Sequence, residues 1–577
     1  MSLITRRKAL QTALLGAAAS CAKAPELTPY TASVEPPGGF FPHGVASGDP
    51  APDSVVIWTR FFNEALSSIA DERRVTWQVA TDRDFTSVVT QGEYGTTADR
   101  DWTAKVLATG LSAGTTYFYR FSMGEAYSAI GQTKTLPAGA VAGANFAVVS
   151  CSNYPFGYFN VYDLIARRDD IDAVIHLGDY IYEYGREGYG GETGAKLGRN
   201  HEPPSECIAL DDYRRRHAQY KADPSAQAMH AKFPLIAIWD DHETSNDSWK
   251  DGAENHDPAT EGEWEARKRA ALQAYYEWMP VRDPEPGKLR EALFRSYSYG
   301  DLLTIASIET RLMARAKPFQ YDEIVPSLRT PEDVARFRNE TLWDASREML
   351  GAAQEQYIAG ALSASVAAGQ PWRVIANQVT MAAVDAPDLR PHVTEEDIAE
   401  LERSWDQARA FIEFSGLGLP LNMDAWDGYP AARDKFYRLA RDAGAEGLLV
   451  ITGDTHTWWA NDLVAKDGAA MGVELGVHSV TSPSPYRKEF LGGKGREYAL
   501  LTAKENKAVR YLSGEDHGYI SLEIARDSAK ARLMAVDTVE SPSYNAFEKA
   551  AIRIKKGPSA PEFAGIDGVS FKEKVLF

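Results

Sequence analysis

The sequence predicts an α/β fold, with a layered sheet-and-helix domain over residues 144–577 and a small all-β sandwich domain over residues 38–137. Three observations support this prediction. Before residue 137, β-branched and aromatic runs are separated by turn residues, as in a small sandwich. Beyond residue 144, continuous apolar runs alternate with helical stretches, as in layered α/β proteins. A stretch rich in Pro, Ala and Gly, residues 137–143, separates the two patterns.

The first 22 residues have the composition of an export signal. Arg6 and Arg7 precede an Ala-rich apolar run over residues 13–19, and small residues follow. This order predicts a twin-arginine export signal over residues 1–22 and a linker over residues 23–37. The run is too short for a permanent transmembrane helix, and no other segment is apolar enough. We expect an exported protein, periplasmic or extracellular, that uses the twin-arginine export machinery. A helical tail and a lipid anchor through Cys21 remain alternatives.

The sandwich is predicted from three strand-like runs, and its expected role is structural. The runs cover residues 54–59, 74–79 and 116–121.

In the second domain, the apolar runs have the length of strands buried on both faces. They cover residues 146–149, 173–177, 235–239, 302–308, 373–376 and 448–452. The predicted helices lie near residues 158–168, 210–221, 263–278, 352–366 and 431–442. Two irregular stretches, residues 186–207 and 385–430, are expected to be surface excursions over the site.

Charge and cysteine content exclude some classes of protein. The net charge is −19, which disfavours a nucleic-acid-binding surface because such a surface needs clustered Lys and Arg. Three cysteines give no disulfide framework.

Polar residues follow six of the predicted strands. They are Cys151 and Asn153, the run 178–183, the run 240–243, the run 309–311, Asn377 with Gln378, and the run 453–458. Ligands of open α/β sheets bind beyond the carboxyl ends of the strands. Six such clusters in one domain therefore predict a site at this edge.

The residue types in these clusters suit metal ions. Asp, Glu, His and Asn bind divalent and trivalent metals, and Cys thiolate and Tyr phenolate suit iron. A shared carboxylate could join two metals, which is an arrangement that serves displacement at phosphorus.

The ordered set of motifs resembles the PhoD-type alkaline phosphatase family, within the metallophosphoesterases related to purple acid phosphatases. The resemblance runs from Phe41 to about Thr481 and includes the opening 41–50. It implies a metallophosphoesterase-type catalytic domain that hydrolyses phosphate esters at alkaline pH by attack of a metal-activated oxygen, with Fe³⁺ and Ca²⁺ as cofactors.

The resemblance also implies roles for single residues. Asp179 would bridge the two metals. Cys151, Tyr182 and His456 would complete the ferric site, with Asn153 nearby. Asp241 and Asp454 would hold calcium, with Asn377 as a further contributor. The catalytic candidates are His242 as a phosphate-stabilising or proton-donating group, Arg311 as a phosphate clamp and Asn246 as a substrate contact.

Several alternatives remain open at this stage. Cys151 could be a buried apolar residue or pair with Cys207, and the sequence does not choose which of Asp240 and Asp241 points into the site. Glu309 stands where the family usually has Asp, and the chain after about Val536 lacks a clear family closing segment.

Two other functions also remain open as alternatives. One is a phospholipase D-like phosphodiesterase acting on phospholipids or wall polymers. The other is an exported binding protein with a decayed metal site.

Overall fold

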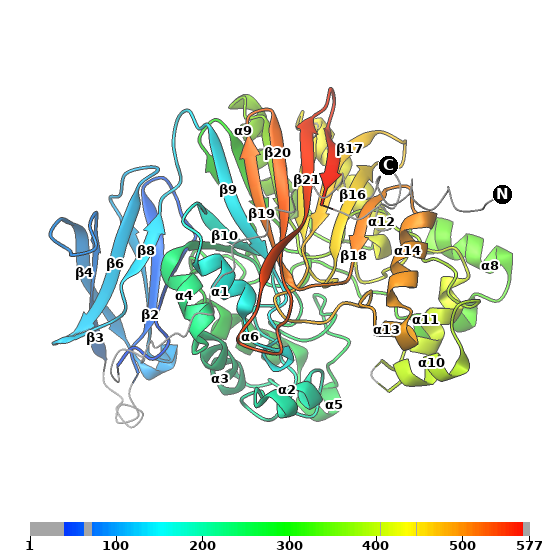
Figure 1. Ribbon diagram of the computed structural model, residues 1–577, viewed down its shortest axis with the longest axis horizontal. Coiled ribbons are helices and arrows are strands. Elements are labelled where there is room, and N and C mark those ends of the chain that lie inside the picture. The colour runs from blue at the N-terminus through cyan, green and yellow to red at the C-terminus, as the bar shows by residue number, and fades with distance from the viewer. Residues whose placement is uncertain (1–39, 63–71, 404, 446, 569–577) are drawn as a thin grey trace, which may run out of the picture.

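The computed structural model describes residues 40–62, 72–403, 405–445 and 447–568. Within these residues the strands form three sheets, and Figure 1 shows their arrangement. The large sheet and the second sheet pack face to face, and the small sheet lies at the left end of the molecule in Figure 1. The predicted export signal and the whole of the predicted linker lie outside the described residues.

The large sheet has ten strands in the described part of the chain, in the order β22-β21-β20-β19-β9-β10-β11-β1-β2-β5. In this order the strands are Pro561–Asp567, Ala546–Lys556, Ser528–Val536, Gly518–Ala525, Gly143–Val149, Ala173–His176, Pro234–Ala237, Val45–Gly48, Ser54–Arg60 and Thr103–Thr109. Strands β9, β10, β11 and β1 are mutually parallel, so the chain ends of β9–β11 meet at one edge.

The second sheet has the order β12-β13-β14-β15-β17-β16-β18. These strands are Arg295–Tyr299, Leu303–Ser307, Trp372–Ala376, Leu448–Thr452, Ala470–Gly476, Trp458–Val464 and Val509–Ser513. Strands β13, β14, β15 and β17 are parallel, as buried crossover-connected strands usually are. All six apolar runs predicted in this domain are strands, with boundaries that differ by at most three residues.

Each central strand is buried on both faces, which explains the continuous apolar runs. Phe146 and Val148 of β9 face the second sheet, where they share a core with Ile305 and Val374. The alternate residue Val149 of β9 packs instead against the outer helices.

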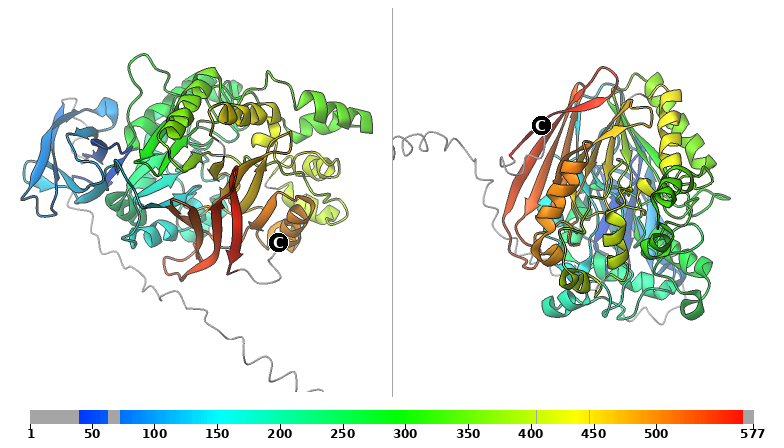
Figure 2. Two further views of the ribbon diagram at one scale, coloured as in Figure 1. Left: turned by 90° about the horizontal axis from the view of Figure 1, so that it is seen from above. Right: turned by 90° about the vertical axis from the view of Figure 1, so that its right-hand side faces the viewer.

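Helices pack on the outer side of both sheets. Those packed on the large sheet include α1 Asn160–Ala166, α3 Leu210–Lys221, α4 Pro224–Lys232 and α6 Trp264–Trp278. Those packed on the second sheet include α9 Ala352–Ala367, α12 Pro430–Asp442 and α14 Gly495–Glu505. Figure 2 shows helices on the outer side of the second sheet. The five helices predicted from the sequence are all present, and the prediction of a layered α/β catalytic part is confirmed.

The N-terminal part is β-rich, as predicted. It has two layers of strands, and only one of these layers is a separate sheet. The small sheet contains β3 Arg73–Ala80, β4 Val88–Thr96, β6 Thr116–Met123, β7 Ala126–Tyr127 and β8 Gly131–Lys134. The opposing layer, β1, β2 and β5, continues the large sheet because β1 pairs with β11. The sandwich and the catalytic part therefore share one sheet, which local residue patterns could not predict.

The two irregular stretches contain short helices. Residues 186–207 include α2 Gly191–Leu197, and residues 385–430 include α10 Glu395–Leu401 and α11 Ala408–Ser415. Thr394 and Asp397 form a capping box at the start of α10, a signal that is visible in the sequence. Two further short helices, α7 Tyr321–Ile324 and α8 Pro331–Arg336, precede them, and α5 Pro258–Glu261 and α13 Phe490–Gly493 complete the set.

The chain after Val536 extends the large sheet. Strands β21 and β22 add an antiparallel hairpin at its edge, beside β20. None of the helices in the described part of the chain has the length and apolar character that crossing a bilayer requires.

Asp49 ties the large sheet to the second sheet. It follows β1, is fully buried, and accepts hydrogen bonds from the Tyr297 hydroxyl of β12 and the Arg282 backbone amide, each at 2.8 Å. Its carboxylate also lies 3.3 Å from the Arg282 guanidinium and 3.4 Å from that of Arg295. One carboxylate therefore pairs with two cations at the junction.

We expect Asp49→Ala to lower the free energy of unfolding by about 3 kcal/mol, because it leaves both guanidinium groups without their carboxylate. Chemical denaturation measures the change. The matched control is Asp84→Ala at an exposed position of the small sheet's loop, which should change stability by less than about 0.5 kcal/mol. Equal unfolding curves for the two variants would contradict the role given to Asp49.

Candidate metal centre

The chemistry-bearing residues lie where parallel strands of both sheets end. Cys151 follows β9, Asp179 follows β10, and Asp454 follows β15. The first two strands belong to the large sheet and the third to the second sheet, so the site lies where the two sheets meet. This is the position that open α/β sheets use for ligands.

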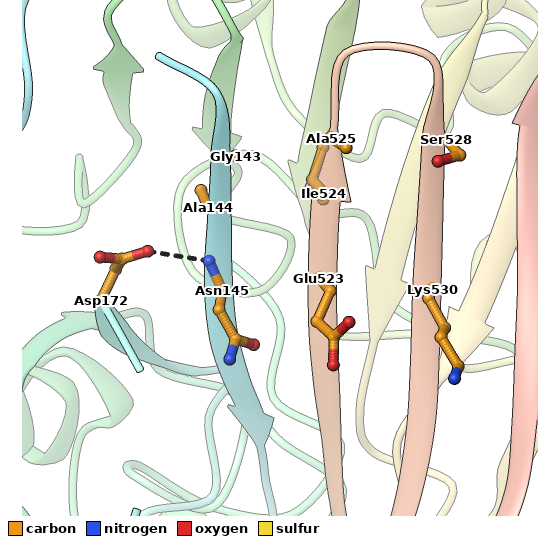
Figure 3. Close-up of a pocket in the computed structure, with 9 residues that line it drawn as sticks. All are labelled: Gly143, Ala144, Asn145, Asp172, Glu523, Ile524, Ala525, Ser528 and Lys530. Carbon is orange, nitrogen blue, oxygen red and sulfur yellow. Dashed lines mark hydrogen bonds between the residues drawn. The ribbon is translucent and has the colours of Figure 1, made fainter. Parts of the chain in front are cut away.

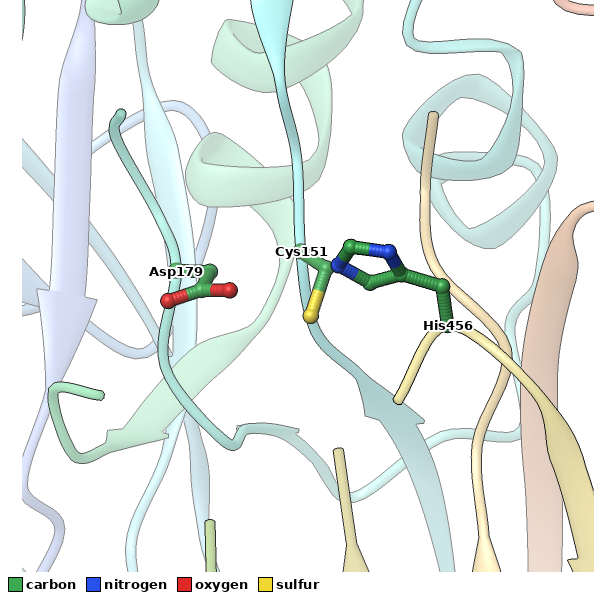
Figure 4. Close-up of side chains that lie close together, drawn as sticks. All are labelled: Cys151, Asp179 and His456. Atoms are coloured by element: carbon green, nitrogen blue, oxygen red, sulfur yellow. The ribbon is translucent and has the colours of Figure 1, made fainter. Parts of the chain in front are cut away.

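One cluster gathers three of the four ligands expected for iron. The ligand atoms of Cys151, Asp179 and His456 lie within 4.8 Å of one another. Figure 4 shows Cys151 between the Asp179 carboxylate and the His456 ring. The Tyr182 hydroxyl joins them, because it donates to Asp179 Oδ2 at 3.0 Å and lies 3.2 Å from His456 Nε2.

Two further clusters adjoin the first. The atoms of Asp240, Asp241 and Asp454 lie within 4.8 Å of one another, as do those of Asp179, Asp241 and His242. Asp179 and Asp241 each belong to two clusters, so the three groups form one continuous site. Asp240 and Asp241 both face it, which answers the ambiguity that strand alternation left open.

The backbone at these positions is strained. Cys151, Asp179, Asp454 and His456 have φ values of 60°, 53°, 62° and 50°, in the left-handed region that non-glycine residues rarely adopt. Such conformations cost on the order of 1–3 kcal/mol each and gather at functional sites. Four of them within one site indicate that the side-chain directions are fixed by the fold.

Glu243 holds the loops of the large sheet in place. Its buried carboxylate accepts hydrogen bonds from the backbone amides of Asp179, Tyr180 and Asp240 at 3.0, 2.6 and 2.8 Å. Gly178 has φ 103°, and a Cβ there would lie 2.4 Å from the Asp240 nitrogen. The glycine is therefore required for the two loops to approach each other.

The site concentrates acidic groups in the protein interior. Burial raises the pKa of Asp454 to about 7, and burial with the neighbouring carboxylates raises that of Asp179 well above its usual range. One oxygen of Asp179, one of Asp240 and one of Asp241 have no hydrogen-bond partner among the described residues. Buried acceptors normally have partners, so the donor set fits cations.

Arg311 is the main cation of the site. Its fully buried guanidinium contacts Asp240, lies 2.5 Å from Asp424 and 3.0 Å from Asp454, and lies 3.6 Å from Asp241. The residue predicted as a phosphate clamp thus has its donors engaged by carboxylates. The pKa of Asp241 stays low, because Arg311 and His242 outweigh the effect of burial.

Glu309, the departure from the family pattern, supports the Arg311 loop. Its carboxylate accepts from Trp239 Nε1 at 3.0 Å and from the backbone amides of Arg311, Leu312 and Met313 at 2.7 to 2.9 Å. It makes these contacts away from the three ligand clusters.

His242 is held by Glu183. Its Nδ1 lies 2.8 Å from Glu183 Oε2, and its ring stacks on Tyr182 with centroids 4.1 Å apart. Burial lowers the pKa of His242, but Asp241, Glu183 and Asp179 outweigh burial and raise it well above its usual range. The other ring nitrogen, Nε2, does not contact Glu183 and is available to the ligand cluster that His242 forms with Asp179 and Asp241.

The three predicted asparagines have different surroundings. Asn153 is buried, and neither atom of its amide has a hydrogen-bond partner in the described part of the chain. Asn377 donates to the Val379 carbonyl at 2.6 Å and accepts from Trp426, while Asn246 donates to Glu254 at 3.0 Å. Of these three asparagines, only Asn153 therefore has a side-chain amide that is not already hydrogen-bonded to another described residue.

Other sequence alternatives also have answers. Cys151 and Cys207 are both free, so they do not pair with each other. Tyr180 turns away from the site and contacts His230 and Lys221.

Four residues of the site went unassigned in the sequence reasoning. Glu183 and Glu243 lie in the runs after β10 and β11, so strand-end position could have found them. Asp424 and Arg315, which form an ion pair, come from irregular segments and gave no such signal.

A cavity of about 490 Å³ lies elsewhere. Figure 3 shows it beside Gly143, Asn145 and Lys530. Gly143 begins β9, whereas Cys151 follows its other end. The cavity is therefore separate from the metal centre.

Comparison with known proteins shows that the chain is similar to phosphatases. The family model of the PhoD-like phosphatase matches residues 146–533, and the family model of the PhoD-like phosphatase N-terminal domain matches residues 27–137. Alkaline phosphatase D of Bacillus subtilis (strain 168) is 33% identical over 536 residues, covering 89% of this chain and 81% of that protein. The solved structure of PhoD aligns with a TM-score of 0.73 and 29% identity, covering 93% of this chain and 94% of that one. The chain belongs to the PhoD-like phosphatase family.

Proposed function

We propose that this phosphoric ester hydrolase is an exported alkaline phosphatase that holds Fe³⁺ and Ca²⁺ at the strand-end clusters. The observation that carries the proposal is the pair of shared carboxylates, Asp179 and Asp241, which join three ligand clusters within one buried site. Two adjacent metal sites with a common carboxylate suit displacement at phosphorus.

The donor types divide the site into two halves. Cys151, Tyr182 and His456 supply sulfur, phenol oxygen and imidazole, which suit Fe³⁺. Asp240, Asp241 and Asp454 supply only carboxylate oxygens, which suit Ca²⁺. Asn153, with its unpartnered amide, is a further donor close to Cys151. We assign Asp179 to both halves.

When bound, the metals would supply an activated water and neutralise phosphate charge. The chain's own groups complete the reaction. His242, held by Glu183, is placed to donate a proton to the leaving oxygen. Arg311 holds Asp240, Asp424 and Asp454 together, and any contact with a phosphate oxygen requires it to release one of these carboxylates.

We further propose export through the twin-arginine route, on the basis of Arg6 and Arg7. Changing both to Lys should retain the protein in the cytoplasm of its host, whereas Lys8→Arg should not. Cell fractionation measures this. Normal export of the double variant would rule out the route.

Asp179→Asn should lower kcat/KM for an aryl phosphate monoester by about 10³-fold, because it removes the shared anionic ligand. Parallel assays with an aryl phosphodiester and a choline phospholipid establish the ester class. The matched control is Asp84→Asn at an exposed position, with unchanged turnover expected. Full turnover by a folded Asp179→Asn enzyme would defeat the proposal.

Glu183→Gln should reduce kcat by about 10- to 100-fold, because Glu183 orients His242. It should also move the alkaline limb of the kcat profile to lower pH. The reason is that Glu183 helps to raise the pKa of His242, so its neutralisation lets the imidazolium lose its proton earlier. A pH–rate profile measures both effects. An unchanged alkaline limb would show that His242 is not the proton donor.

A further inference from the structure

The loop over residues 481–484 lies directly behind the proposed ferric ligands. It follows β17, and each of its first three residues contacts the backbone or side chain of a ligand residue. None of the residues that were given a role from the sequence lies in this loop, so its contacts have no function assigned to them.

The first contacts fix the Cys151 loop. The backbone amides of Thr481 and Ser482 donate to the Cys151 carbonyl at 3.3 and 3.5 Å. The Thr481 hydroxyl donates to the Asn153 carbonyl at 2.7 Å. These bonds span the segment that contains the left-handed Cys151, whose φ is 60°. They therefore help to keep the thiol directed into the site.

The next contact fixes the His456 ring. Its Nδ1 lies 3.1 Å from the Pro483 carbonyl, which can only accept a hydrogen bond. Nδ1 must therefore carry the proton, which leaves Nε2 as the free ligand atom. Nε2 is the nitrogen that faces Tyr182, at 3.2 Å from its hydroxyl oxygen.

The last contact reaches Tyr182 itself. The Ser482 hydroxyl lies 2.8 Å from the Tyr182 oxygen and 3.3 Å from the Cys151 carbonyl. Ser482 has one hydroxyl hydrogen, and the shorter distance favours Tyr182 as its acceptor. Tyr182 uses its own hydrogen towards Asp179, so its oxygen is available to accept. Ser482 is fully buried, so water does not compete with this bond.

We propose that Ser482 is a positioning residue of the metal centre, which donates a hydrogen bond to the Tyr182 oxygen and so sets the strength of the bond from that oxygen to iron. The proposal rests on the proposed function, because it requires Tyr182 to be a ligand. A hydrogen bond to a ligand atom draws electron density from it, and outer contacts of this kind commonly change metal affinity by 10- to 100-fold.

The loop supplies a matched control. Ser484 is also buried, but its hydroxyl bonds to Thr457 at 2.7 Å and to the Tyr486 backbone amide at 3.1 Å. Ser484→Ala removes the same atom from the same loop without touching a ligand. Any effect of general loosening should appear equally in Ser482→Ala and Ser484→Ala.

The experiment compares the metal-loaded wild type, Ser482→Ala, Ser484→Ala and Ser482→Thr by visible spectrum and by release of iron to a chelator. Loss of the Ser482 bond should move the tyrosine-to-iron band to longer wavelength, because the phenol oxygen then donates its electrons more easily. Iron affinity should change by about 10- to 100-fold. Ser484→Ala should match the wild type, and Ser482→Thr should restore the band position.

The possible results are distinguishable. A Ser482→Ala band and iron affinity equal to those of the wild type would overturn the role of Ser482 while leaving the metal centre intact. The same shift in Ser484→Ala would overturn it as well, because loop packing would then be the cause. An active wild type without iron and without a band would overturn the proposed function, and the role of Ser482 with it.

Discussion

The structure depends on the burial of many carboxylates at one edge of two facing sheets. Asp179, Asp240, Asp241, Asp424 and Asp454 lie around one site, and Arg311 and Arg315 are the cations that contact them. The carboxylates outnumber the two guanidinium groups and the neighbouring His242 ring. Buried charges without partners are costly, and burial accordingly raises the pKa of Asp179 and Asp454. Further cations would therefore stabilise the site, and its two kinds of donor set are those that suit the two proposed metals. The need to hold these carboxylates close together explains why so many buried contacts surround the strand ends.

The fold holds these groups in place through carboxylates that act as backbone braces. Glu243 gathers three amides around the Asp179 and Asp240 loops, and Glu309 gathers three around the Arg311 loop. Asp49 performs a similar task where the N-terminal strands meet the second sheet. Each brace satisfies amides that the ends of strands leave without sheet partners. In this way the left-handed backbone at the ligand positions is determined by the surrounding structure instead of by local preference.

The sequence predicted most of the architecture, because the buried strands are continuous apolar runs and the helices have clear periodicity. It also predicted the strand-end position of the site, and the structure brings Cys151, Asp179 and His456 together there. Other features depend on contacts between distant segments. The pairing of β1 with β11, which joins the sandwich to the catalytic part, leaves no local signal. Asp424 reaches Arg311 from an irregular stretch, and the side chain of Asn377 turns to Val379 and Trp426 although its position beyond β14 resembles that of the other candidates.

The most direct test of this account is the metal content of the protein purified without added metal, measured together with its visible spectrum and its turnover of phosphate esters. The account predicts bound iron and calcium, and a visible band that disappears in Tyr182→Phe, because the Tyr182 oxygen lies with Asp179 and His456 in one cluster. Removal of the metals should abolish turnover while the chain stays folded. Full turnover by a folded protein that contains neither metal would contradict the account, because the buried carboxylates would then need a different explanation.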